Sequence, residues 1–413
     1  MDLDSFHSTP PSSFPNGSQP ARTPRHTVDR RIRVLVVDDS FFMQRRLTDI
    51  IQSAPDLRVI GCADNGADAI SLAERLAPDV ITMDINMAKF DGLYAIDFIM
   101  RSNPKPIVII SSYTQKGSRA ALYGLEMGVI DIVEKPSSGG VALDIADRAT
   151  EIIAKVRTAS RVRVVRTLRG NSRDAISTPA PPATAPDESP KIDTRLPHLK
   201  FPTGLPHVIA MCSSTGGPVA LQDLLRGMPY EFFPPIVIVQ HLPEKFTREF
   251  ASQLDAVSSL DVCEAQEGQQ LRNGQVYVAP GGMHLQVDAH GRLVINHGPP
   301  VNHCKPSADV LLHSLARHFG LQTLAFVLTG MGEDGAAGAL AIKRAGGTVI
   351  AQDEATSVVY GMPAAAFRAG GVDHVLSLEN MKQVLNGLGA QARNPQPTAA
   401  VLPAPASPSF PTP

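Results

Sequence analysis

The sequence contains no tryptophan and only four cysteines among its 413 residues, and no two cysteines form a C-x-x-C pair. Neither a disulfide framework nor a structural zinc site is therefore expected, and the scattered thiols suit a reducing cytoplasm. No apolar run approaches the roughly 18 residues that cross a bilayer, and residues 1–4 lack the basic and apolar regions of a secretory signal. The formal net charge of −2 excludes a strongly basic chain that coats nucleic acid. These absences predict a cytoplasmic protein with no membrane insertion and no nucleic-acid partner.

Proline is concentrated in three clusters, at 10–24, 179–206 and 395–413, which hold more than half of the 35 prolines. Proline removes a backbone donor and fixes φ, so such clusters do not belong inside packed helices or central strands. The sequence therefore divides into a disordered tail (1–30), a domain (31–155), a linker (156–205), a second domain (206–393) and a second disordered tail (394–413).

The linker opens with seven basic residues between Lys155 and Arg173, with no acid among them. A contact with nucleic acid or with an acidic surface is one interpretation of such a run. The run has few aromatic residues for base stacking and lies outside both domains. We expect a solvated helix end followed by linker.

Both domains alternate short apolar runs with longer amphipathic stretches. The apolar runs are at 32–37, 57–62, 80–83, 107–111 and 130–133 in the first domain and at 208–212, 236–240, 324–329 and 347–352 in the second. This βαβα rhythm predicts an α/β fold, in which each domain is a doubly wound parallel sheet with helices on both faces. A glycine-rich stretch at roughly 276–298 predicts a hairpin within the second domain.

Polar residues stand where the apolar runs of the first domain end: Asp38, Asp39, Asp84, Ser111 and Lys135. With the strand order 2-1-3-4-5, the three aspartates converge at the switch point, where ligands bind in such sheets. Mg²⁺ would relieve their mutual repulsion, and an aspartate beside it can carry a phosphoryl group. Lys135 would face the phosphate oxygens, and Ser111 would hydrogen-bond the new oxyanion. The alternative is a set of helix caps and loop acids.

This arrangement resembles the receiver domain of bacterial two-component systems over about 31–150. The matching strings are V-V-D-D-S (36–40), M-D-I-N-M (83–87), D-G (91–92) and K-P (135–136). The resemblance implies a flavodoxin-like fold with Asp84 as phospho-acceptor. It also implies Mg²⁺ held by Asp38, Asp39, Asp84 and the Asn86 carbonyl, with Ser111 and Lys135 as the phosphate switch. Receivers usually have proline where Ala88 stands, a change that removes no functional group.

In the second domain a serine, a histidine and an acid each follow an expected strand: Ser213 or Ser214, His241 and Asp334. A serine nucleophile needs a base within hydrogen-bond reach, and that base needs a carboxylate. The glycines at 330, 332 and 335 allow a loop to present N–H groups as an oxyanion hole. The order Ser…His…Asp differs from that of α/β-hydrolases. Other histidines remain alternatives to His241: His284, His297, His303, His313 and His318.

Six motifs then occur in one order: S-S-T-G-G-P (213–218), Q-H-L-P (240–243), A-P-G-G-M-H (279–284), V-N-H-C-K-P-S-A-D (301–309), T-G-M-G-E-D-G-A (329–336) and Y-G-M-P (360–363). They resemble the catalytic domain of the chemotaxis protein-glutamate methylesterase family, a three-layer α/β domain joined to an N-terminal receiver. The resemblance implies a triad of Ser214, His241 and Asp334, with the Met331 backbone N–H at the oxyanion.

The same resemblance implies an activity. Family members demethylate glutamyl methyl esters of chemoreceptors, giving methanol and glutamate, and many also deamidate receptor glutamines. The esterase reaction needs no cofactor. A chemotaxis histidine kinase would supply the phosphoryl group, and the unphosphorylated receiver would pack over the esterase site and hinder substrate.

Two departures from the family pattern and two rival functions remain. Cys212 stands where the family commonly has glycine, and His303-Cys304-Lys305 stands where members usually carry Arg-His-Arg. The second departure predicts a change in the contacts with substrate or between domains.

A response regulator that binds nucleic acid would need a basic helix-turn-helix, which 206–393 lacks. A catalytically inactive adaptor is disfavoured by the intact triad.

Overall fold

The computed structural model describes residues 30–87, 91–111, 115–136, 142–162, 204–228 and 233–393, together with 164, 197, 199, 201 and 202. The predicted disordered tails and most of the predicted linker lie outside the described residues. No helix in these ranges is long and apolar enough to span a membrane.

The first domain contains a five-stranded parallel sheet. Its strands, in spatial order, are β2 (Leu57–Ala63), β1 (Ile32–Val37), β3 (Val80–Met83), β4 (Ile107–Ser111) and β5 (Asp131–Glu134). The predicted order 2-1-3-4-5 is confirmed. β1 and β3 are neighbours whose carboxyl ends point the same way, so the residues that follow them come together.

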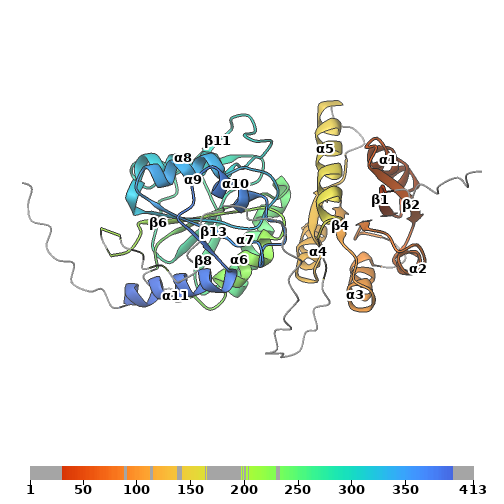
Figure 1. Ribbon diagram of the computed structural model, residues 1–413, viewed down its shortest axis with the longest axis horizontal. Coiled ribbons are helices and arrows are strands. Elements are labelled where there is room, and N and C mark those ends of the chain that lie inside the picture. Colours follow the sequence, from red (N-terminus) through yellow and green to blue (C-terminus); the bar gives the residue numbers. More distant parts are fainter. Residues whose placement is uncertain are drawn as a thin grey trace, which may run out of the picture.

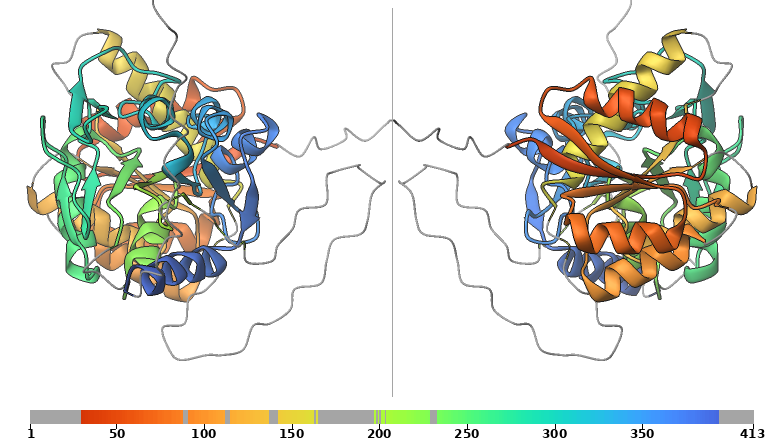
Figure 2. Two further views of the ribbon diagram at one scale, coloured as in Figure 1. Left: turned by 90° about the vertical axis from the view of Figure 1, so that its left-hand side faces the viewer. Right: turned by 90° about the vertical axis from the view of Figure 1, so that its right-hand side faces the viewer.

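Helices cover both faces of this sheet, as Figure 2 shows on its right-hand side. They are α1 (Phe41–Gln52), α2 (Gly66–Leu76), α3 (Gly92–Ser102), α4 (Gln115–Glu126) and α5 (Ala142–Ala159). Alternate residues of β1 point to opposite faces, as strand geometry requires. Val34 packs with α1 and α5, whereas Leu35 packs with α2, α3 and α4.

The second domain contains a seven-stranded parallel sheet. Its strands, in spatial order, are β14 (His374–Leu376), β13 (Thr348–Gln352), β12 (Thr323–Val327), β6 (Val208–Ser213), β7 (Ile236–Gln240), β9 (Gln275–Val278) and β8 (Asp261–Glu264). The predicted hairpin is shorter than expected and comprises β10 (His284–Val287) and β11 (Leu293–Asn296). Residues 276–278 were wrongly assigned to it, because they belong to the largely buried strand β9, which pairs with β7 and β8 in the main sheet.

Two layers of helices enclose this sheet, as Figure 1 shows. One layer comprises α6 (Gly217–Leu225), α7 (Thr247–Val257) and α11 (Leu378–Arg393); the other comprises α8 (Ala308–His318), α9 (Ala336–Arg344) and α10 (Met362–Arg368). Two short 3₁₀ helices, η1 (Glu244–Phe246) and η2 (Gly320–Gln322), precede α7 and β12. The three-layer α/β architecture agrees with the prediction.

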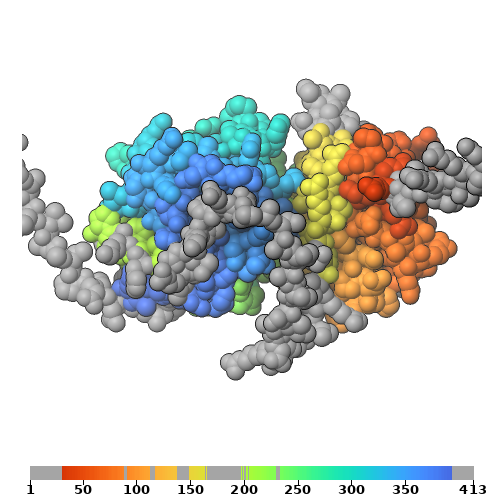
Figure 3. Space-filling view, viewed as in Figure 1, coloured from red at the N-terminus to blue at the C-terminus, as the bar shows by residue number. Residues whose placement is uncertain are grey.

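The two domains lie side by side, with α4 and α5 of the first facing α6 and α7 of the second (Figure 1). In the space-filling view, α5 lies against the second domain (Figure 3). The first basic residues of the expected linker belong to this helix, which continues to Ala159. The expectation of solvation was wrong for Lys155, which is buried, whereas Arg157 remains partly exposed and forms a surface ion pair with Asp56 at 2.6 Å.

Candidate functional site

An acidic pocket forms at the carboxyl ends of β1 and β3. Oxygen atoms of Asp38, Asp39 and Asp84 lie within 4.8 Å of one another. Asp38 and Asp84 are buried, whereas Asp39 is exposed to solvent. The three carboxylates that the sequence placed at the switch point are therefore together.

Lys135 follows β5 and bridges two of these carboxylates. Its Nζ lies 2.6 Å from Asp38 Oδ2 and 2.6 Å from Asp84 Oδ2, and it donates a hydrogen bond to the latter. Asp38 Oδ2 is buried and is ion-paired with the Lys135 ammonium. Burial raises the pKa of Asp38, although Lys135 opposes the shift. Three carboxylates around a single ammonium leave a net negative charge, and a donor set of carboxylate oxygens fits a hard cation such as Mg²⁺.

Ser111 lies at the end of β4, beside this pocket. Its buried hydroxyl accepts a hydrogen bond from Asn86 Nδ2 at 3.3 Å, and the Asn86 N–H donates to Asp84 Oδ1 at 3.1 Å. The predicted phosphate-binding residues are thus within one connected group. Ala88, the departure from the receiver pattern, lies outside the described residues.

The serine turn of the second domain distinguishes its two adjacent serines. Ser213 is the last residue of β6 and is fully buried, and its hydroxyl donates to Gln240 Oε1 at 2.6 Å. Ser214 lies one residue further, in the turn before α6, with 8% of its surface exposed. A Cβ on Gly217 would lie 2.1 Å from Gln240 Oε1, so the turn needs glycine there to pack this closely. The geometry therefore favours Ser214 over Ser213 as a nucleophile.

His241 and Asp334 form a close pair across the carboxyl edge of the sheet. His241 Nε2 lies 2.8 Å from Asp334 Oδ2, and Ser307 Oγ donates to Asp334 Oδ1 at 2.6 Å. The Ala308 N–H, at the start of α8, donates to Asp334 Oδ2 at 2.6 Å. Burial opposes ionisation of Asp334, but these hydrogen bonds outweigh it and lower its pKa. The carboxylate is therefore charged and fixed in place to orient the imidazole.

The other imidazole nitrogen faces a thiol. His241 Nδ1 lies 3.7 Å from Cys304 Sγ, and in the described part of the chain no hydrogen bond joins Ser214 Oγ to the imidazole. Burial alone would lower the pKa of His241, but the hydrogen bonds to Asp334 and Cys304 outweigh it and raise that pKa to about 10. To accept the proton of a serine, the imidazole must carry no proton on Nδ1. In this conformation the base is present but not yet paired with its nucleophile.

A glycine-rich loop from β12 completes the site. A Cβ on Gly330 would lie 2.3 Å from Met362 Sδ and 2.9 Å from Ser214 Cβ, so a larger residue would force these segments apart. The next residue, Met331, has a backbone N–H that donates no hydrogen bond within the described ranges. Such an amide is available to an oxyanion.

The alternative histidines lie in other environments. His284 is buried, with its two ring nitrogens bonded to the Pro299 carbonyl and the Ser307 N–H. The remaining four are exposed: His297, His303, His313 and His318. His241 is therefore the histidine that pairs with a buried carboxylate.

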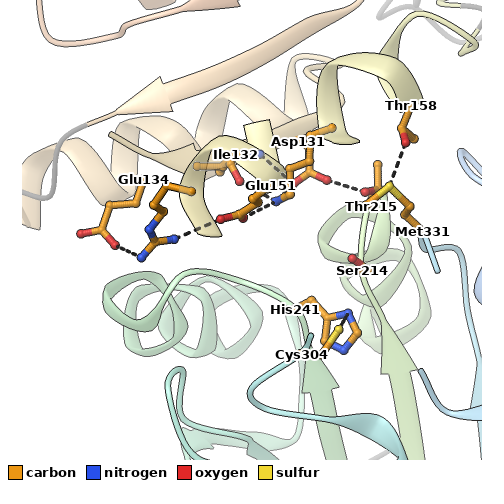
Figure 4. A network of polar contacts seen from close by, with 12 residues as sticks. Asp131, Ile132, Glu134, Glu151, Thr158, Ser214, Thr215, His241, Cys304 and Met331 are labelled. Carbon is orange, nitrogen blue, oxygen red and sulfur yellow. Dashed lines mark hydrogen bonds and ion pairs between the residues drawn. The ribbon is translucent and has the colours of Figure 1, made fainter. Parts of the chain in front are cut away.

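A network that the sequence did not reveal joins the two domains at the serine turn (Figure 4). Asp131, at the start of β5, accepts a hydrogen bond from the hydroxyl of Thr215, the residue after Ser214. Its other oxygen accepts from Lys155 Nζ at 2.8 Å, and Lys155 also donates to the Ile132 carbonyl at 2.8 Å. Asp131, Lys155 and Thr215 are all buried. Although burial lowers the pKa of Lys155, the negative charges of Asp131 and Glu151 outweigh it and raise that pKa.

Further contacts between the domains surround this network. Thr158 Oγ1 donates to Met331 Sδ at 2.8 Å, so α5 also contacts the candidate oxyanion loop (Figure 4). Three polar pairs are more peripheral: Arg119 with Glu249, Gln222 with Glu126, and Lys245 with Glu134. The first domain therefore covers the serine turn and the loop that follows β12.

Comparisons with known proteins match each of the two domains to a family. Residues 34–145 match the response regulator receiver domain family, and residues 209–385 match the CheB methylesterase family. A protein-glutamate methylesterase/protein-glutamine glutaminase of Pyrococcus abyssi is 39% identical over 366 residues, covering 86% of this chain and 93% of that protein. The protein-glutamate methylesterase/protein-glutamine glutaminase 2 of Pseudomonas aeruginosa is 43% identical over 357 residues, covering 86% of this chain and 96% of that protein. The crystal structure of the Thermotoga maritima CheB methylesterase catalytic domain has 39% identity and a TM-score of 0.43, covering 44% of this chain and 98% of that one.

Proposed function

The chain belongs to the protein-glutamate methylesterase/protein-glutamine glutaminase family, and from this premise we propose that it demethylates and deamidates chemoreceptors under the control of its receiver domain. The substrates are glutamyl methyl esters, which yield methanol and glutamate, and glutamine side chains. We assign the receiver to 31–155 and the esterase to 206–393. The observation that carries the proposal is the His241–Asp334 pair beside Ser214 and the Met331 amide.

In the proposed mechanism, Ser214 Oγ attacks the ester carbonyl while His241 accepts its proton. Asp334 holds the imidazole by Nε2, so Nδ1 is the nitrogen that must receive this proton. The Met331 N–H stabilises the tetrahedral oxyanion. His241 then returns the proton to the departing methoxide, which leaves as methanol, and a water molecule hydrolyses the acyl-enzyme by the same steps.

The receiver would carry the regulatory phosphoryl group on Asp84. Asp38, Asp39, Asp84 and the Asn86 carbonyl are the proposed ligands of Mg²⁺, which when bound would neutralise charge on the phosphoryl oxygens. Lys135 is already beside Asp84 and can bind those oxygens. Ser111 can turn toward them once it leaves Asn86. The phosphodonor is proposed to be a chemotaxis histidine kinase.

The strand β5 offers a direct route from this pocket to the esterase. Lys135 follows its carboxyl end, and Asp131 begins it and contacts Thr215. Four residues of strand span only about 13 Å at roughly 3.3 Å per residue. A movement of Lys135 on phosphorylation can therefore shift the contact that holds the receiver over Ser214, which changes a two-state equilibrium between covered and open forms.

The function is tested by incubating the purified full-length chain with membranes that contain methyl-labelled chemoreceptors. Methanol release and receptor deamidation are expected from the wild type and are expected to fall by several orders of magnitude in Ser214→Ala, because the nucleophile is lost. Near-normal release by Ser214→Ala would reject the proposed nucleophile. No release by the wild type, with or without a phosphodonor, would reject the proposed activity.

A further inference from the structure

A second group of metal-ligating side chains lies in the esterase domain. His241, Cys304 and Asp334 place ligand atoms within 4.8 Å of one another. Unlike the acidic pocket, this group offers nitrogen and sulfur as well as oxygen. The esterase mechanism uses His241 and Asp334 but gives no role to the thiol of Cys304.

A tight turn over 301–304 holds Cys304 opposite His241. Val301 and Cys304 exchange two backbone hydrogen bonds, of 3.1 and 2.8 Å. The central residues Asn302 and His303 have φ values of 50° and 61°, and positive φ at both positions is characteristic of a type I′ turn. Asn302 Nδ2 also donates to Asp309 Oδ2 at 2.8 Å, which anchors the turn to α8. The thiol is therefore carried by a fixed backbone.

The separation of the two candidate ligand atoms suits a tetrahedral zinc ion. His241 Nδ1 and Cys304 Sγ are 3.7 Å apart. Zinc bonds of about 2.0 Å to nitrogen and about 2.3 Å to sulfur place two tetrahedral ligands roughly 3.5 Å apart. The existing geometry thus needs only a small adjustment to hold the ion between the two side chains.

Asp334 supplies the remaining feature of a zinc-binding histidine. Such histidines usually donate their second ring N–H to a carboxylate, which fixes the ring and its tautomer. Here Asp334 Oδ2 lies 2.8 Å from His241 Nε2, and Ser307 and Ala308 hold the carboxylate in turn. Nδ1 is thereby directed toward Cys304.

We propose that Zn²⁺ binds between His241 Nδ1 and Cys304 Sγ, with water in its other positions, and that it inhibits the esterase by occupying the nitrogen that must accept the Ser214 proton. On binding, Cys304 releases its thiol proton to solvent and His241 releases any proton on Nδ1, and no atom changes oxidation state. The site itself is independent of turnover, whereas the inhibition rests on the proposed function. The His241 side chain is 14% exposed to solvent.

The two metal-binding groups of the chain then select different ions. An imidazole and a thiolate favour zinc and neighbouring transition metals, whereas carboxylate oxygens suit Mg²⁺. Magnesium would support phosphorylation at Asp84, and zinc would oppose catalysis at His241.

The binding step is tested with Co²⁺ as a spectroscopic probe of the full-length chain in excess Mg²⁺. We expect a thiolate-to-cobalt charge-transfer band that saturates at one Co²⁺ per chain and is displaced by Zn²⁺. The band should be lost in Cys304→Ser and kept in Cys263→Ser, a matched control at another partly buried thiol. It should also be kept in Ser214→Ala, so the site is tested even if the proposed nucleophile is wrong. A band that survives in Cys304→Ser, or no band in the wild type, overturns the proposal.

The inhibition is tested by titrating Zn²⁺ into the methanol-release assay. Each variant is compared with its own metal-free rate. Saturating Zn²⁺ should slow the wild type and Cys263→Ser by about 100-fold, the scale of a lost general base, and should leave most of the Cys304→Ser rate. Equal inhibition of the wild type and Cys304→Ser would show that zinc acts elsewhere and would overturn the inhibitory role.

Discussion

Asp131, the first residue of β5 in the receiver, accepts a hydrogen bond from Thr215, the residue that follows Ser214 in the esterase. Lys135, at the other end of the same strand, donates to Asp84. One short strand therefore contacts both the proposed phosphorylation site and the proposed nucleophile turn. This arrangement gives the regulation a specific structural basis that substitutions can test.

Removal of the Thr215 hydroxyl should weaken the contact between the domains. In Thr215→Val, the hydrogen bond to the Asp131 carboxylate is lost, and bonds to charged groups contribute about 1.5 kcal/mol or more. We expect methanol release by the unphosphorylated chain to rise by about 10-fold, with a correspondingly smaller stimulation by acetyl phosphate. Asp223→Asn serves as the control, because this half-exposed residue of α6 pairs with Lys382 of α11 in the esterase domain. An unchanged basal rate in Thr215→Val would exclude this contact as a restraint.

Substitutions at the buried pair of Asp131 and Lys155 should have strongly non-additive effects on the free energy of unfolding. Lys155→Met leaves the Asp131 carboxylate without its buried partner, and breaking such a pair costs about 3–5 kcal/mol. We expect the unfolding free energy in urea to fall accordingly, and expect Asp131→Asn in the same chain to recover much of the loss. Additive effects of the two substitutions would show that the pair does not act as a unit.

The two adjacent serines should respond differently to alanine. Ser213→Ala removes the bond to Gln240, and we expect a loss of about 1 kcal/mol in unfolding free energy with activity retained within a few fold. Ser214→Ala should fold normally and lose activity. Thermal unfolding and methanol release, measured on both variants, separate these roles, and the reverse pattern would make Ser213 the nucleophile.

Phosphorylation should require both Asp84 and the divalent cation. Asp84→Asn removes the acceptor oxygen, and chelation of Mg²⁺ removes the charge that offsets the phosphoryl group. Each change should abolish uptake of label from acetyl phosphate. Asp64→Asn, at an exposed carboxylate after β2, should label like the wild type. Labelling that persists in Asp84→Asn would point to another acceptor.

The sequence was sufficient for the strand order of the first sheet and for the meeting of Asp38, Asp84 and Lys135, because each of these residues directly follows a buried parallel strand. It could not predict the bond between Asp131 and Thr215, since these residues lie 84 positions apart and on different domains. Lys155 was misjudged for a related reason. In the sequence, Lys155 is the first member of a basic run, and only the packing of α5 shows that it is buried.

The side chain of Cys304 illustrates a further limit. The sequence marked the 303–305 segment as a departure from the family pattern. The two positive φ values in the 301–304 turn, which place the thiol 3.7 Å from His241 Nδ1, depend on a backbone conformation unusual for residues other than glycine. No hydrophobic periodicity encodes such a turn.

The central claim is that the unphosphorylated receiver restrains the esterase. The most direct measurement compares methanol release from methylated receptors by the full-length chain and by the fragment 200–393, each with and without acetyl phosphate. We predict that the fragment is faster than the unphosphorylated full-length chain and that acetyl phosphate accelerates only the full-length chain. Equal rates for the two proteins, with no effect of acetyl phosphate on either, would contradict the account.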